Sequence, residues 1–194
     1  MIDFIREYTF QHESEIMEMI EAIIEGTKIK NIIEIGTKNG GTAYLWAQLV
    51  RPYGGKVYCI DKKFGWKDDY LIYHETKFFD QIVELEGDSD DPKILSLLES
   101  ALNGTKVELL FIDGAHDYEM VEKDFLNYSK FVSPKGWIAF HDIINSKVEV
   151  GKFWEELKYR YEYFEFLLDN QPLKKRKPAF HGPDDKNGIG LIRW

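Results

Sequence analysis

The 194-residue chain contains one cysteine, Cys59, and this scarcity limits how the fold can be stabilised. A single thiol forms neither an intrachain disulfide nor the multi-cysteine ligand set of a structural zinc site. The chain also lacks the run of about 18 consecutive apolar residues that a membrane-spanning helix needs. Its first residues, MIDFIREYTF, lack the apolar run of a signal peptide. These absences predict a cytoplasmic protein without a membrane segment.

Basic residues are also fewer than acidic residues in this chain. Lys and Arg number 25 against 34 Asp and Glu, which gives a formal net charge of -9 and a pI near 5.1. Nucleic acids and anionic membranes are bound by basic faces that neutralise phosphates, so we expect neither as a partner. Apolar residues still make up 44% of the chain, enough for a sizeable core. The length predicts a single domain over 1–194, with an N-terminal helix within 1–28 and a long loop over 169–187.

Apolar patterning predicts an α/β fold in which short strands alternate with helices. Strands are expected at 32–35, 57–60, 82–85, 107–112, 137–140, 164–168 and 189–193, and helices after the first near 41–51, 66–79, 92–102, 118–131 and 147–159. Strands separated by helices imply parallel pairing with both faces covered. No helix separates the last two strands, so they should form an antiparallel hairpin. The predicted architecture is a three-layer, doubly wound, mostly parallel seven-stranded sheet with a C-terminal antiparallel hairpin strand.

Two local signals mark element boundaries. Asp91 followed by Pro92 is typical of an N-cap and first turn, so it predicts the start of the helix near 92–102. The segment Ser-Pro-Lys-Gly at 133–136 predicts a turn leading into the fifth strand.

Aspartates follow four successive predicted strands. Asp61, Asp88, Asp113 and Asp142 are separated by 27, 25 and 29 residues. Ligands of doubly wound sheets bind beyond the carboxyl ends of the strands, where these side chains should gather. Any one of them could be a helix cap. Four like charges on one rim, however, repel one another unless a cation or ligand compensates them.

The loop after the first strand carries Glu34, Gly36 and Gly40. The glycines allow a tight turn and a close approach of the backbone to a ligand. No Gly-Lys-Ser/Thr follows, and Lys38 stands where the second glycine of G-x-G-x-x-G would be, so a pyrophosphate cofactor is disfavoured. Glu34 would also repel phosphate, and it suits a cationic or amine-bearing ligand.

The motif Glu34-x-Gly36-x-x-x-Gly40, with the acids after the second and third strands, resembles the first motif of class I S-adenosylmethionine (SAM)-dependent methyltransferases. The resemblance extends from about residue 12 to the C-terminus and implies SAM as the cofactor. It implies that Glu34 and Gly36 lie near the amino-acid part of SAM, that Asp61 accepts the ribose hydroxyls and that Asp88 faces the adenine. The cofactor residues implied in this way are Glu34, Gly36, Thr37, Gly40, Asp61, Asp88 and Ser89.

A narrower resemblance comes from Phe-Ile-Asp-Gly-Ala-His-Asp-Tyr at 111–118 and Phe-His-Asp at 140–142. These segments are similar to the metal-dependent macrocin- and mycinamicin-type O-methyltransferases and to the cephalosporin-hydroxylase group. The resemblance implies that Asp113 and Asp142 hold a divalent cation, Mg2+ or similar, and that His116 is the general base. His141 stands where that pattern usually has a carboxylate. It is either a ligand that suits softer ions, a residue that orients Asp142, or a core residue.

The function predicted on this basis is methyl transfer from SAM to a hydroxyl of a small metabolite, a sugar or natural product, assisted by a divalent metal. Two alternatives stay open: a non-catalytic SAM- or nucleoside-binding module serving a partner enzyme, and a metal-independent N- or C-methyltransferase. A small-molecule substrate is the expected partner, and a homo-oligomer is compatible with the sequence. Four basic residues, Lys174, Lys175, Arg176 and Lys177, form either a solvated turn or a contact for an anionic substrate.

Overall fold

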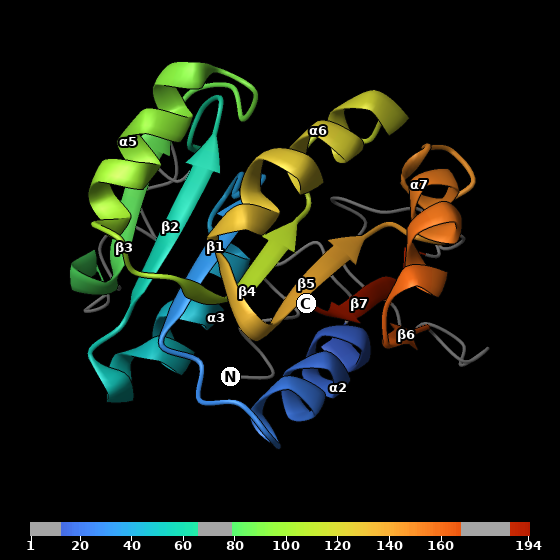
Figure 1. The fold of residues 1–194 in the computed structure, drawn as a ribbon, viewed down its shortest axis with the longest axis horizontal. Helices are drawn as coiled ribbons and strands as arrows, with labels where there is room; N and C mark the ends of the chain where they lie inside the picture. The colour runs from blue at the N-terminus through green and yellow to red at the C-terminus, as the bar shows by residue number, and fades with distance from the viewer. Residues whose placement is uncertain (1–12, 66–78, 168–186) are drawn as a thin grey trace.

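The computed structural model describes residues 13–65, 79–167 and 187–194. Within these ranges, seven strands form one sheet in the order β3-β2-β1-β4-β5-β7-β6 (Figure 1). The strands are β1 (Asn31–Ile35), β2 (Lys56–Asp61), β3 (Ile82–Glu86), β4 (Val107–Ile112), β5 (Val132–His141), β6 (Tyr163–Phe166) and β7 (Ile189–Arg193). The first five pair in parallel, whereas β7 lies between β5 and β6 and runs antiparallel to both. The predicted sheet and its C-terminal hairpin are confirmed.

Helices cover both faces of the sheet (Figure 1). On one face lie α2 (Glu13–Ile24) and α3 (Gly41–Val50), and on the other lie α5 (Pro92–Leu102), α6 (Tyr118–Tyr128) and α7 (Val150–Leu157). As predicted, Asp91 caps α5, because its side chain accepts a hydrogen bond from the Lys93 backbone N–H at 2.8 Å. The three-layer architecture therefore agrees with the prediction. Across the described ranges, no helix is both long and apolar enough to cross a membrane.

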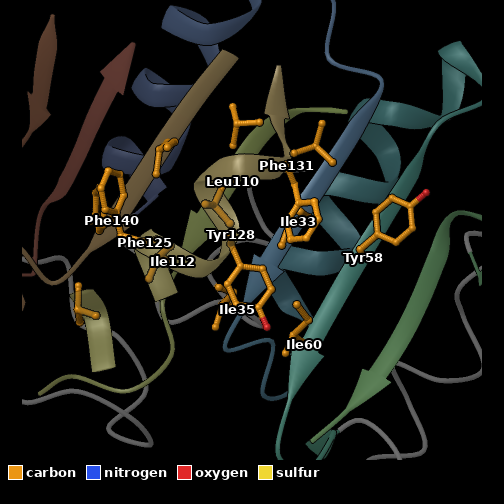
Figure 2. Packing of buried hydrophobic residues seen from close by; sticks show 14 of the residues in the cluster. Ile33, Ile35, Tyr58, Ile60, Leu110, Ile112, Phe125, Tyr128, Phe131 and Phe140 are labelled. Atoms are coloured by element: carbon orange, nitrogen blue, oxygen red, sulfur yellow. The ribbon is translucent and has the colours of Figure 1, made fainter. Parts of the chain in front are cut away.

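Side chains along each strand point alternately to the two faces of the sheet, so the hydrophobic core consists of two layers. Ile33 and Ile35 of β1 pack with α5 and α6, whereas Ile32 packs with α2 and α3. Figure 2 shows the first layer, in which Tyr128 of α6 lies among side chains of β1, β2 and β4. Each fully buried isoleucine contributes about 1.5–3 kcal/mol through its removal from water. Burial on both faces thus fixes the register of the central strands.

The structure differs from the sequence expectation at the start of β5. Residues 133–136 do not form a separate turn but belong to one strand, Val132–His141, whose pairing with β4 shifts between Val107 and Leu109. Between the pairs Val107–Val132 and Leu109–Trp137, β5 contains three more residues than β4, and Lys135 within this bulge adopts a left-handed conformation with φ 65°. The predicted helix near 66–79 and the basic residues Lys174 to Lys177 lie, apart from residue 79, outside the described residues.

Candidate active site

A pocket of about 470 Å³ opens beyond the carboxyl ends of the parallel strands. Its lining comes from the loops after β1, β2, β3, β4 and β5, together with Met120 of α6 and Asn187 before β7. The strand order reverses at β1, which lies between β2 and β4, and such switch points are where doubly wound sheets bind ligands. The volume falls in the range of small-molecule sites.

The loop between β1 and α3 brings the backbone close to the neighbouring strand. Gly36 has φ 87°, and a Cβ atom there would lie 1.9 Å from the carbonyl oxygen of Asp113. Lys38, at the position of the missing second glycine, also takes a left-handed conformation with φ 50°. Its backbone N–H donates to Asp61 Oδ2 at 2.7 Å. Gly36 and Thr37 line the pocket, whereas Gly40 precedes α3 with φ 79°.

Glu34 lies beneath the pocket rather than in its wall. Its side chain is fully buried, and Trp46 Nε1 donates to Oε1 at 2.8 Å. Burial raises the pKa of Glu34 to about 7, although Trp46 and two threonine side chains act in the opposite direction. Those threonines, Thr37 and Thr42, do line the pocket. Glu34 is therefore separated from a ligand by a layer of hydroxyl groups.

Asp61 and Asp88 occupy different settings. Asp61 lines the pocket, and its two carboxylate oxygens accept the backbone N–H groups of Lys38 and Lys63, which fixes its orientation. Asp88 is half exposed, does not line the pocket and pairs with Lys62 at 2.6 Å. Its neighbour Ser89 does line the pocket. The structure thus brings Asp61 and Ser89 to the pocket and leaves Asp88 at its margin.

The predicted metal residues come together at the ends of β4 and β5. His141 Nδ1 lies 3.1 Å from Asp113 Oδ1 and 3.3 Å from Asp142 Oδ2. Burial alone would lower the pKa of His141, but the two carboxylates raise it to about 10. Burial likewise acts to raise the pKa of Asp113, yet His141 and His116 hold it at about 2. The cluster therefore compensates its own charges to a large extent.

His116 approaches the same carboxylates from the loop between β4 and α6. Its Nε2 lies 3.3 Å from Asp142 Oδ2 and 3.9 Å from Asp113 Oδ1, and its side chain remains 44% exposed. Interaction with Asp113 raises the pKa of His116, burial opposes this and Asp142 adds to it. Asp117 caps α6 by accepting from the Met120 N–H at 3.1 Å, which fixes the loop behind His116.

Sequence reasoning missed several residues that shape the site. Asn145 Nδ2 donates to Asp142 Oδ1 at 3.2 Å and to Asn187 Oδ1 at 3.3 Å. Asn145 lies three residues after Asp142, a spacing that signals a local contact, but nothing in the sequence links it to Asn187. Trp46 was missed as the partner of Glu34, because an aromatic residue on a helix is more often read as plain core.

Asp124 of α6 is a further buried carboxylate that was not anticipated. Its side chain is fully buried and neither oxygen makes a hydrogen bond of ordinary length within the described residues. Burial raises the pKa of Asp124 to about 6, against a lowering by the nearby Ser89 side chain. The folded state therefore binds a proton at this residue more readily than the unfolded chain does.

Asp124→Asn should stabilise the protein near neutral pH. The raised pKa, about 6, costs the folded state up to about 3 kcal/mol wherever the carboxylate is ionised, so we expect a gain of about 1–2 kcal/mol above pH 6. The gain should vanish below about pH 4, where both states are protonated. Urea unfolding across this pH range measures it. The control Glu122→Gln, at an exposed acid of the same helix, should change the free energy of unfolding by less than about 0.5 kcal/mol. A destabilised Asp124→Asn variant at high pH would contradict this account.

Comparison with known proteins agrees with this architecture. Residues 33–143, more than half of the chain, match a family model described as "Methyltransferase domain". The chain is also 30% identical over 140 residues to uncharacterized protein R132 of Acanthamoeba polyphaga mimivirus; the match covers 69% of this chain and 60% of that protein. The chain thus accounts for less than two thirds of the relative's length.

Solved structures share the fold at low sequence identity. The O-methyltransferase TomG from Streptomyces achromogenes, in complex with SAM, has a TM-score of 0.67 and 16% identity, covering 99% of this chain and 86% of its own. The MycE methyltransferase, in complex with Mg, SAH and mycinamycin VI, has a TM-score of 0.54 and 19% identity, covering 73% of this chain and 38% of its own. The fold is that of class I methyltransferases, and the chain belongs to the methyltransferase-domain family.

Proposed function

We propose that this protein transfers a methyl group from SAM to a hydroxyl of a small metabolite, such as a sugar or natural product, with the help of a divalent cation. The observation that carries the proposal is a single pocket lined both by Asp61 and by Asp113, His116 and Asp142. A donor and an acceptor bound in one pocket meet the first requirement for direct transfer. The ligands present in the TomG and MycE complexes support the same donor here.

The lining suits a positively charged donor. Asp61 offers a carboxylate whose orientation two backbone N–H groups fix, and Glu34 adds an acid beneath the loop. These acids favour the ammonium and sulfonium groups of SAM and disfavour phosphates. In this proposal Gly36 and Thr37 lie beside the amino-acid part of SAM, Gly40 shapes the turn that leads into α3, and Asp61 accepts the ribose hydroxyls. Ser89 contacts the adenine, and Asp88 lies at the margin of that side of the pocket.

The donor set also fits a divalent cation, whose binding would release the proton that the imidazole of His141 holds between the two carboxylates. Asp113, His141 and Asp142 each offer one ligand atom, and these atoms lie within 4.8 Å of one another. SAM supplies an electrophilic methyl group when bound, and the cation supplies a lower pKa for the acceptor hydroxyl. His116 Nε2 receives the proton of that hydroxyl, since its side chain remains accessible at the pocket. Orienting the two reactants contributes about 7–11 kcal/mol toward lowering the barrier.

Asp61→Asn should weaken SAM binding about 10- to 100-fold, because a hydrogen bond to a charged acceptor contributes about 1.5–3 kcal/mol. Equilibrium dialysis with labelled SAM measures the affinity. Glu99→Gln is the matched control, since Glu99 is an exposed acid of α5 that pairs with Lys130 at 3.1 Å away from the pocket lining. Equal SAM affinity in the two variants would contradict the ribose role of Asp61. Tight SAM binding without turnover on any hydroxylated acceptor would favour a non-catalytic binding module.

A further inference from the structure

Asp113, His141 and Asp142 form the one cluster of three metal-ligating side chains in the part of the chain that the structure describes. The cluster contains one imidazole and two carboxylates, and His141 is only 3% exposed. Water cannot easily replace a ring that is buried in this way. The nitrogen donor is thus a fixed part of the site.

We infer that this cluster selects a borderline transition-metal ion, such as Mn2+, Co2+ or Zn2+, over Mg2+. The inference rests on the proposed metal role of Asp113 and Asp142 and deepens it by naming the class of ion. Mg2+ prefers an octahedral shell of oxygen ligands and retains several waters. Imidazole nitrogen instead strengthens binding of the later divalent ions.

The separations within the cluster are compatible with a small divalent ion, and the 3.1 Å contact of His141 with Asp113 is itself of hydrogen-bond length. Mg2+ and the first-row ions share bonds of about 2.1 Å, so the nitrogen donor rather than the spacing carries the choice of ion. Two ligands at right angles around a metal with bonds of about 2.1 Å lie about 3.0 Å apart. His141 Nδ1 lies 3.1 Å and 3.3 Å from the oxygens of Asp113 and Asp142. Ca2+, which takes six to eight oxygen ligands at longer distances, is not matched by this small mixed set.

The backbone at Asp142 makes this arrangement feasible. Successive side chains of an extended strand point to opposite faces, so His141 and Asp142 would normally diverge. Asp142 instead has φ 65°, a left-handed conformation that an aspartate adopts at some cost in energy. Both side chains consequently reach Asp113. Such local strain tends to persist where the site requires it.

Asn145 determines which oxygen of Asp142 faces the cluster. Its Nδ2 donates to Oδ1 at 3.2 Å, which leaves Oδ2 directed at His141 and His116, each at 3.3 Å. Hydrogen bonds of this kind orient carboxylate ligands in metal sites. Asn145 therefore acts as a positioning residue for the proposed ion.

Calorimetric titration of the chelator-treated 194-residue chain with Mn2+, Co2+ or Mg2+ alone tests the inference. We expect Mn2+ or Co2+ to bind at least about 100-fold more tightly than Mg2+. His141→Glu replaces the nitrogen donor by a carboxylate. It should reduce the ratio of Mn2+ affinity to Mg2+ affinity at least about 10-fold. Circular dichroism verifies that the variant remains folded.

Pulsed electron paramagnetic resonance of bound Mn2+ gives a second readout that needs no activity. Wild-type protein should show a nitrogen hyperfine coupling, which His116→Gln retains and His141→Gln removes. The wild-type spectrum alone decides whether nitrogen is a ligand, so the test holds even where the His141 variants do not fold.

Three results would overturn the inference: equal affinity for Mg2+ and Mn2+, bound Mn2+ without a nitrogen coupling, or no binding of any ion. In the last case His141 alone would bridge the two carboxylates.

SAM affinity, measured in the same preparations, separates the proposed function from the proposed ion class. Protein that binds the ions as expected but not SAM contradicts the proposed function and leaves the ion class intact, whereas protein that binds SAM but no ion contradicts the ion class.

Discussion

Gly36→Ala should lower the free energy of unfolding by more than about 4 kcal/mol. The added Cβ would lie 1.9 Å from the carbonyl oxygen and 2.4 Å from the carbonyl carbon of Asp113, and φ at Gly36 is 87°. Both contacted atoms belong to the backbone, so no side-chain rotation relieves the overlap. The Asp113 N–H also donates to the Ile35 carbonyl at 2.9 Å, so relief requires β1 and β4 to separate.

Gly104→Ala is the matched control for this prediction. Gly104 has φ 77°, close to that of Gly36, but a Cβ there meets no atom within 4 Å. Its substitution should cost only the left-handed strain of about 1–2 kcal/mol. Urea unfolding of both variants measures the difference. Similar losses at the two positions would mean that the close approach of the two strands is not what requires glycine at Gly36. Any folded Gly36→Ala protein should also have lost its affinity for SAM.

His116→Ala should reduce methyl transfer about 100- to 10,000-fold while SAM affinity stays unchanged. A positioned general base contributes a factor of this size. Release of S-adenosylhomocysteine, measured with the best acceptor from a screen of sugars and phenols, gives the rate. The loss should appear in kcat, because the side chain acts on the proton of the acceptor rather than on donor binding.

The adjacent Asp117→Ala is the control for the base. Asp117 caps α6 through the Met120 N–H at 3.1 Å and does not line the pocket, so its loss should cost about 1 kcal/mol of stability and little rate. His116→Ala protein that keeps half of the wild-type rate would exclude a base role. A rate loss in both variants would indicate that the order of the loop, rather than the imidazole, determines turnover.

Much of the fold was predictable because buried strands and helices have characteristic patterns of apolar residues in the sequence. Ile32–Ile35 and Val107–Ile112 lie in central strands covered on both faces, and such strands read as short apolar runs. Element ends were less accurate. The helix expected to reach residue 131 ends as α-helix at Tyr128 and continues as a 3-10 turn. Residues 133–136 were predicted as a turn, and in the structure they belong to β5 but have no partner in β4, so their turn-like composition marks a bulge.

The location of the site was more predictable than the contacts and backbone conformations of its residues. Parallel strands place their carboxyl ends on one rim, so the gathering of Asp61, Asp113 and Asp142 followed from spacing. Asp88 instead pairs with Lys62 outside the pocket lining. The order of the strands predicts where β3 ends, but it does not predict the direction that the following loop takes. The left-handed conformation of Asp142 was also not predictable, since it depends on contacts from separate elements.

Calorimetric titration of the wild-type protein with SAM measures whether the acidic pocket holds a sulfonium donor. We expect saturable binding of one SAM per chain, competed by S-adenosylhomocysteine and not by NAD. Absence of binding at millimolar SAM, or binding of NAD in its place, would contradict this expectation.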